Sequence, residues 1–205
     1  MGIVEEAPRS FRVLVLPGGQ VSSRAPSRCW QLARVRTALL TRGLRRRLGP
    51  DFVVEPVQYR YRGWNAPDLD PVTDADRALS AVPASSGPII LVGHSMGGRV
   101  AAHVAARHTI AGIVALAPWW PNDDAALIPA ATRLRVLHGI DDSWTDPESS
   151  RRQTVSARDR GVDAEWSALT RAGHFMVRRW RVWHTRTTQL VLDVAERVPA
   201  ARGER

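Results

Sequence analysis

Short apolar runs alternate with amphipathic helical patterns along most of the chain, and this alternation restricts the fold more than any other feature. The sequence predicts strands over residues 11–16, 52–59, 88–92, 110–117, 135–138 and 164–169. It predicts helices over residues 27–47, 74–82, 96–107, 146–160 and 183–198. Strands that are apolar throughout and alternate with helices are typical of a parallel sheet with helices on both faces. We therefore predict a single α/β domain over residues 1–205, with its core over about 11–198 and a frayed end at 199–205.

Composition limits the environment and the partners of this domain. The chain has 205 residues and a net charge of +9, and all 29 of its basic residues are arginine. Most arginines are scattered, which is typical of a solvated surface, although 45–47 form a cluster where a helix should end. No apolar run approaches the roughly 20 residues of a membrane span, and the start lacks the apolar centre of a signal peptide. With Cys29 as its single cysteine, we expect a cytoplasmic protein without disulfides or a membrane partner, and nucleic acid as an unlikely ligand.

A candidate nucleophile stands directly after the third predicted strand. Residues 93–98 read Gly-His-Ser-Met-Gly-Gly, a G-x-S-x-G pattern between a strand and a helix. Such a pattern places the serine on a sharp turn with its hydroxyl above the sheet. Gly93 and Gly97 permit the turn because a Cβ at either position would collide with neighbouring backbone. Ser95 is the predicted nucleophile.

A serine hydroxyl needs a base, and His174 occupies the best position for one. It follows the sixth predicted strand in the segment Ala172-Gly173-His174-Phe175. His184 begins the last predicted helix and is expected on the surface. The remaining histidines are expected to be packing, surface or supporting groups: His94, His103, His108 and His138.

Three carboxylates near the end of the fifth predicted strand compete to orient the base. The chain order Ser, Asp, His fits either Asp141 or Asp142. Asp146 precedes Pro147 and is expected to cap the following helix instead. For the oxyanion hole we expect the backbone N–H of Met96, and a second N–H from Gly19 or Gln20 in the loop after the first strand.

These motifs together resemble the α/β-hydrolase superfamily from Phe11 to about Val198. Residues 93–98 resemble its nucleophile elbow, 172–175 its histidine loop, and 62–65 the arginine–glycine turn that many members carry. Residues 139–142 resemble its G-x-x-D motif, which implies Asp142 as the acid. Residues 16–19 resemble its oxyanion loop, with Pro17 where the family has histidine.

The resemblance also implies a reduced member of this superfamily. Few residues precede the first strand, so the usual opening hairpin is missing and about six parallel strands are expected. Many relatives carry a helical lid between the fourth and fifth strands, for which residues 118–134 are too few. We therefore expect an open site that is covered mainly by loops.

Several residues at the same rim are candidates for binding an acyl group. Trp64, Trp119, Trp120 and Trp144 follow strand ends and either line the pocket or cover the sheet edge. Arginines at 62, 178 and 179 could add positive charge, although a surface role is the simpler interpretation. Asp123 and Asp124 lack the spaced partners of a metal site, so we expect no metal and no cofactor.

The sequence therefore favours a lidless serine hydrolase that cleaves a small-molecule ester or thioester. An acyltransferase or cyclase would use the same three residues and stays open. A third interpretation is a non-catalytic module on the same fold that binds nucleic acid or an acidic partner through its basic surface. Sequence alone assigns neither the substrate nor the oligomeric state.

Overall fold

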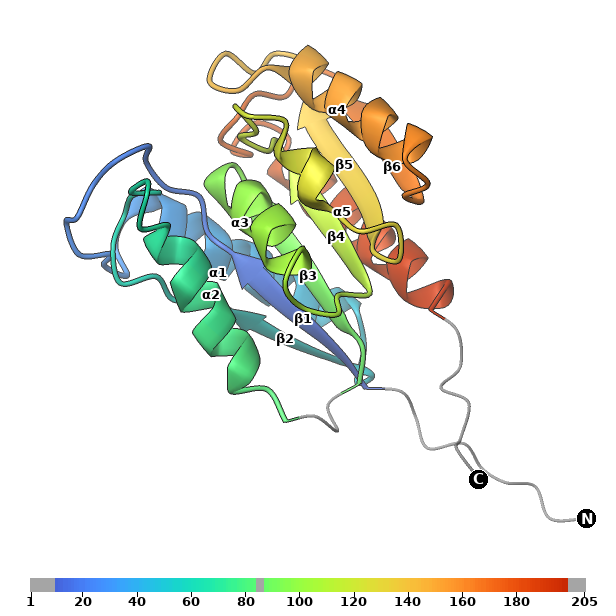
Figure 1. The fold of residues 1–205 in the computed structure, drawn as a ribbon, viewed down its shortest axis with the longest axis horizontal. Helices are drawn as coiled ribbons and strands as arrows, with labels where there is room; N and C mark the ends of the chain where they lie inside the picture. The colour runs from blue at the N-terminus through green and yellow to red at the C-terminus, as the bar shows by residue number, and fades with distance from the viewer. Residues whose placement is uncertain (1–9, 84–86, 199–205) are drawn as a thin grey trace, which may run out of the picture.

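Each predicted apolar run forms a strand, and the strands make one parallel sheet (Figure 1). The computed structural model describes residues 10–83 and 87–198. The strands lie in the order β2-β1-β3-β4-β5-β6, and all neighbouring pairs are parallel. The predicted α/β class and the reduced six-stranded sheet are confirmed. The strand bounds are β1 (Phe11–Leu16), β2 (Phe52–Pro56), β3 (Ile89–His94), β4 (Gly112–Leu116), β5 (Arg133–Gly139) and β6 (Ala164–Leu169).

Helices cover both faces of this sheet. Figure 1 shows α1 (Leu32–Arg47) and α5 (Trp180–Glu196) behind the sheet. The front face carries α2 (Asp70–Ser80), α3 (Met96–Ala105), α4 (Pro147–Asp159) and the short 3₁₀ helix η1 (Asp124–Leu127). This arrangement is what continuously apolar parallel strands require, because both of their faces need cover.

Alternate strand residues divide the core into two layers. In β1, Val13 and Val15 pack with α1 and α5, whereas Leu14 and Leu16 pack with α2 and α3. All four side chains are buried. The period-2 alternation of strand side chains therefore anchors the sheet to both helical layers and holds its carboxyl edge in place.

Helix α1 begins later than predicted. Ser27 does not cap it, because residues 20–27 run alongside residues 60–63 with backbone hydrogen bonds such as Ser27 N–H to the Arg60 carbonyl. The helix starts only at Leu32, after Gln31. Trp30 consequently lies outside the helix and is exposed rather than on its inner face.

The other elements differ from the prediction mainly at their ends. Strand β2 stops at Pro56, helix α2 starts at Asp70 with Pro71 in its first turn, and helix α5 starts at Trp180. Asp146 caps α4 as predicted, since its side chain accepts a hydrogen bond from the Glu148 N–H. The arginines at 45–47 occupy the last turn of α1, where cations suit the helix dipole.

Two expectations fall on segments that the structure leaves out. The absence of a signal segment at the start and the frayed end at 199–205 both lie outside the described residues. In the part of the chain that is described, no helix is long and apolar enough to cross a membrane.

Candidate active site

Ser95 lies on a strained turn between β3 and α3. Its backbone has φ 54° and ψ −117°, a region that side-chain-bearing residues rarely adopt. A Cβ on Gly93 would stand 2.3 Å from the Gly97 carbonyl oxygen, and one on Gly97 would stand 2.2 Å from that of Leu16. The two glycines therefore allow the turn to pack against its own helix and against β1.

His174 lies within hydrogen-bond reach of this serine. Its Nε2 is 3.0 Å from Ser95 Oγ, and its Nδ1 is 2.8 Å from Asp142 Oδ2. A carboxylate only accepts hydrogen bonds, so Nδ1 carries the proton and Nε2 is free to accept the serine proton. The three groups, which are distant in sequence, thus meet at the carboxyl edge of the sheet.

Asp142, rather than Asp141, contacts the base. Burial by itself raises the pKa of Asp142, but hydrogen bonds from His138, His174 and the Thr145 and Trp144 N–H groups outweigh it and hold the pKa well below the usual range. The carboxylate is therefore charged at any moderate pH. No arginine of the described segments pairs with it, and the groups around it are imidazoles, a hydroxyl and backbone amides.

Two further side chains contact the same Asp142 oxygen as His174. His138 is fully buried, with Nε2 at 3.1 Å from Asp142 Oδ2 and Nδ1 at 2.7 Å from Ser150 Oγ. The Thr145 hydroxyl donates to Asp142 Oδ2 at 2.9 Å and lies 3.2 Å from His174 Nδ1. His138 fits the expected supporting role. Thr145 is a contributor that the sequence analysis missed, and no local motif marks it.

His94 forms a hydrogen bond to the loop that carries His174. Its Nε2–H donates to the His174 carbonyl oxygen at 2.8 Å, and its ring is buried. Burial, reinforced by the nearby His174, lowers the pKa of His94 to about 3. A neutral imidazole therefore ties the nucleophile turn to the loop that carries the base.

The loop after β1 lies beside the serine, as an oxyanion hole requires. Gln20 N–H donates to the Arg62 carbonyl at 2.8 Å, so this donor is already used. A Cβ on Gly19 would stand 2.3 Å from Met96 Cε. Gly19 therefore permits close packing of the loop on Met96, whose own N–H begins α3 and has no partner within the helix. This geometry favours Gly19 over Gln20 as the second donor.

A cavity of about 310 Å³ opens over Ser95 and His174. Two of the four candidate tryptophans, Trp119 and Trp144, line it. Phe175 and Arg36 also line it, and neither was predicted. Arg36 was hidden from the sequence analysis because it lies on α1, far along the chain from every strand-end motif.

Trp64 and Trp120 do not line this cavity. Trp64 is buried and packs edge-on against Trp119. Trp120 is buried too, and its Nε1–H donates to the Gly98 carbonyl at 3.2 Å. For these two, covering the sheet edge is the role that the structure supports, because their rings are turned into the protein.

The arginines considered at the rim lie elsewhere as well. Arg62 borders a neighbouring cavity, formed with Tyr59 and Tyr61. Arg179 donates to the Thr170 carbonyl at 2.7 Å and, like Arg178, is exposed and not part of the cavity over Ser95. The cation at the mouth is therefore Arg36.

A second buried carboxylate lies on the front face, away from the serine. Asp124 accepts hydrogen bonds from Arg99 Nε at 2.7 Å and His103 Nε2 at 3.1 Å. Burial by itself raises the pKa of Asp124, but the bonds from His103 and Arg99 outweigh it and lower the pKa. Arg99 also stacks over the Trp64 and Trp119 rings. Among the described residues, Asp123 and Asp124 are not part of any cluster that could hold a metal ion.

His184 corrects the sequence interpretation, because it is buried rather than at the surface. It packs against Gly43 of α1, where a Cβ would stand 2.8 Å from His184 Nδ1. The small residue on α1 admits the ring between the two helices, and this pairing across the molecule leaves no signal in the local sequence.

Comparison with known proteins agrees with the fold. A family model described as the alpha/beta hydrolase family matches residues 13–203. No curated protein sequence matches the chain. Est1E from Butyrivibrio proteoclasticus is similar in structure with a TM-score of 0.66 and 11% identity, over 95% of this chain and 92% of that one.

Two further solved structures show the same fold. The propionate-bound esterase Est2 from Thermogutta terrifontis has a TM-score of 0.63 and 17% identity, over 98% of this chain and 89% of that one. A protein from Agrobacterium tumefaciens, described as an alpha/beta hydrolase of unknown function, has a TM-score of 0.70 and 16% identity, over 96% and 91%. The match to the family model covers nearly the whole chain, and the chain therefore belongs to the alpha/beta hydrolase family.

Proposed function

We propose that this hydrolase cleaves a small-molecule carboxylic ester or thioester through an acyl-enzyme on Ser95. The observation that carries the proposal is the continuous relay from Ser95 Oγ through His174 to Asp142, with distances of 3.0 and 2.8 Å. Nucleophile, base and orienting acid at these distances form the arrangement that acyl transfer to serine requires.

In the first step, Ser95 Oγ attacks the substrate carbonyl while His174 Nε2 takes the serine proton. The imidazolium that forms is stabilised by the charged Asp142 at Nδ1. The same proton passes to the leaving alcohol or thiol as the bond to the carbonyl carbon breaks. Water, deprotonated by His174, then attacks the acyl-enzyme and releases the acid and free Ser95.

The developing oxyanion needs donors that are already in position. The N–H groups of Gly19 and Met96 fit this role, and one such donor contributes about 3 kcal/mol of barrier lowering in serine hydrolases. The first turn of α3 adds its dipole, because its N-terminus begins directly at the nucleophile.

The cavity favours a small acyl or alcohol group that is flat or apolar. Its rim includes the rings of Trp119, Trp144 and Phe175. Est2, which shares this fold, is named as an esterase and holds propionate. Oxygen esters of short acids are therefore the first substrates to test, beside the matched thioesters.

The test joins covalent labelling to turnover. We expect a fluorophosphonate to add once to the folded protein, at Ser95, and p-nitrophenyl butyrate to be hydrolysed. Ser95→Ala should abolish labelling and lower turnover by about four to six orders of magnitude. Ser80→Ala, at the exposed end of α2, is the matched control and should behave as wild type.

The proposal fails if the folded protein is not labelled and Ser95→Ala keeps its turnover of every ester and thioester tried. Product analysis with an added amine or alcohol tests the reaction type. Predominant transfer of the acyl group to that nucleophile in preference to water would replace hydrolysis with acyl transfer.

A further inference from the structure

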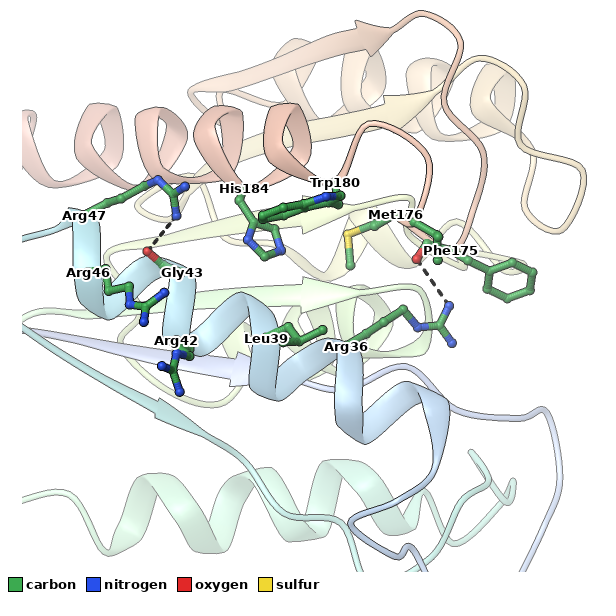
Figure 2. A pocket seen from close by; sticks show the side chains of 11 residues that line it. Arg36, Leu39, Arg42, Gly43, Arg46, Arg47, Phe175, Met176, Trp180 and His184 are labelled. Carbon is green, nitrogen blue, oxygen red and sulfur yellow. Dashed lines mark hydrogen bonds between the residues drawn. The ribbon is translucent and has the colours of Figure 1, made fainter.

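A second and larger cavity, of about 670 Å³, lies between α1 and the segment that leads into α5. Figure 2 shows residues of α1 along one side and Phe175, Met176, Trp180 and His184 along the other. We call this cavity the α1–α5 groove. It is larger than the cavity over Ser95, and the proposed chemistry does not use it.

The groove carries positive charge that no carboxylate balances. Arg36, Arg42, Arg46 and Arg47 line it, and in the described part of the chain none of the four forms an ion pair with a carboxylate. Within the described ranges, no acidic residue lines the groove either. By contrast, the buried guanidinium groups of Arg99 and Arg135 pair with aspartates. The groove therefore holds four guanidinium groups without a carboxylate counter-charge among the described residues.

Arg36 and Arg47 lie on the face of α1 that points across the groove, whereas Arg42 and Arg46 lie at the edge of that face. Arg36, Leu39, Gly43 and Arg47 are three or four residues apart and therefore share one face of α1. From Arg36 to Arg47 the helix rises by about 16 Å. Figure 2 places Arg36 at one end of the groove and Arg47 at the other, with Leu39 between them.

The floor of the groove is apolar. Leu39, Val177 and Trp180 line it, and each keeps about half or more of its surface exposed, at 55%, 71% and 49%. Met176 completes this surface, with His184 beneath. Exposed apolar side chains that gather in a concave site indicate a ligand with apolar character. Together with the arginines, the floor calls for a molecule that is both apolar and anionic.

The groove adjoins the cavity over Ser95, because Arg36 and Phe175 line both. The Arg36 guanidinium stacks 4.8 Å from the Phe175 ring centre and donates to the Phe175 carbonyl. Burial lowers the pKa of Arg36, so its charge is partly desolvated without a counter-ion. An anion beside it would compensate that cost. Phe175 also directly follows the proposed base, His174.

We propose that the α1–α5 groove binds the distal part of the substrate, and that this substrate is an amphiphilic ester or thioester with a phosphate or carboxylate group at its far end. The ester carbonyl lies at Ser95, an apolar segment passes Phe175 and covers Leu39 and Trp180, and the anionic end meets Arg42, Arg46 and Arg47. The link to catalysis rests on the proposed function, whereas the binding site itself does not. Arginine suits this role because its planar fork matches both anions.

A monomeric ligand fits these observations better than a bilayer. Leu39 lies on one side of the groove and Met176 and Trp180 on the other, so an alkyl chain between them contacts apolar side chains on both sides. Insertion into a membrane surface instead needs apolar groups that protrude from the protein.

Binding of dodecyl phosphate, kept below its micelle concentration, tests the site without relying on turnover. We expect saturable one-to-one binding by calorimetry to both wild type and Ser95→Ala. Arg42→Gln and Arg46→Gln should each weaken it at least fivefold, and Leu39→Glu more than tenfold. The matched control is Arg186→Gln, an exposed arginine of α5 outside the groove, which should change affinity less than twofold. The neutral dodecyl maltoside should bind at least tenfold more weakly.

Competition tests the link to the Ser95 cavity. We expect dodecyl phosphate to inhibit hydrolysis of the small neutral ester p-nitrophenyl acetate competitively in wild type, with an inhibition constant equal to its dissociation constant. Binding without inhibition would overturn the assignment to the substrate. A protein that binds dodecyl phosphate but is not labelled at Ser95 would contradict the proposed function alone.

Three results would overturn the site itself. One is equal binding of dodecyl maltoside and dodecyl phosphate. Another is an effect of Arg42→Gln no larger than that of Arg186→Gln. The third is binding to vesicles of anionic phosphatidylglycerol that depends on these arginines while monomeric dodecyl phosphate does not bind, which would assign the groove to a membrane surface.

Discussion

Two buried carboxylates lie in the same fold with opposite surroundings. Asp142 accepts hydrogen bonds from two imidazoles, a hydroxyl and backbone amides. Asp124 is held by the Arg99 guanidinium as well as by His103. Both pKa values are lowered, so both groups are ionised, yet only the charge of Asp124 is neutralised by a permanent cation.

This difference separates a reactive network from a structural one. A carboxylate without a permanent cation beside it keeps an unneutralised negative charge, so it stabilises an imidazolium that forms next to it. A carboxylate that already faces arginine gives little further stabilisation and instead locks two segments together. A lowered pKa alone therefore does not identify a catalytic acid, and the charge state of its partners decides.

The largest expected effect is the loss of activity in Asp142→Asn. The amide cannot stabilise the His174 imidazolium and favours the wrong tautomer, so turnover of p-nitrophenyl butyrate should fall by about 10⁴. The melting temperature should change little, because the Asn side chain fits the same space. Steady-state kinetics beside a thermal melt measure both. Near-normal turnover would remove Asp142 from the relay.

The second expectation is a loss of stability without a large loss of activity. Asp124→Asn leaves the buried Arg99 without its counter-charge, and the free energy of unfolding should fall by about 3 kcal/mol. Turnover of the folded protein should stay within about threefold of wild type, since Asp124 does not touch the Ser95 cavity. Urea denaturation measures the loss.

Glu148→Gln provides the control for this variant, because it removes an exposed carboxylate that pairs with Arg151 on α4. Its urea denaturation midpoint should be unchanged. If Asp124→Asn also left the urea denaturation midpoint unchanged, Asp124 would have no structural role, and the distinction between Asp142 and Asp124 would fail.

The smallest expected effect appears in mild acid. Because burial lowers the pKa of His94 from 6.5 to about 3, the unfolded chain takes up a proton at this side chain below pH 6.5 while the folded protein does not. The free energy of unfolding should therefore decrease from pH 7 to pH 5, with about 2 kcal/mol from His94. The carboxylates contribute little there, because their ordinary pKa values near 4 place the loss of their stabilising effect mainly below about pH 5.

Comparing wild type with His94→Gln isolates this contribution. The pKa of His184 is also lowered by burial, but His184 is present in both proteins and cancels in the difference. The variant should lose about 2 kcal/mol less than wild type between pH 7 and pH 5. Equal acid sensitivity in urea titrations would show that His94 is not held neutral.

The fold was largely predictable because its signals are local. The run 11–16, for example, is bounded by Ser10 and by the turn residues 17–19, and the strand has the predicted ends. The proposed relay was also anticipated, since each of its members follows a strand and the carboxyl ends of parallel strands share one edge. The choice of Asp142 over Asp141 came from a family motif, and the structure brings Asp142 to His174.

The rest depended on contacts between distant segments. Helix α1 starts at Leu32 rather than at residue 27, because residues 20–27 pair with residues 60–63. Local capping signals do not reveal this competing pairing. His184 is buried because Gly43 stands opposite it. Arg36 reaches the site from a helix, and no strand-end search would find it.

The connection between β4 and β5, where many relatives carry a lid, is fastened down in this protein. Asp124 ties it to α3, and Gln153 and Arg160 of the α4 region bond the backbone at Ala125. A segment that is fixed by these hydrogen bonds cannot act as a lid that closes over the substrate. Substrate selectivity then depends on a binding site that is formed before the substrate arrives, so binding costs little conformational entropy.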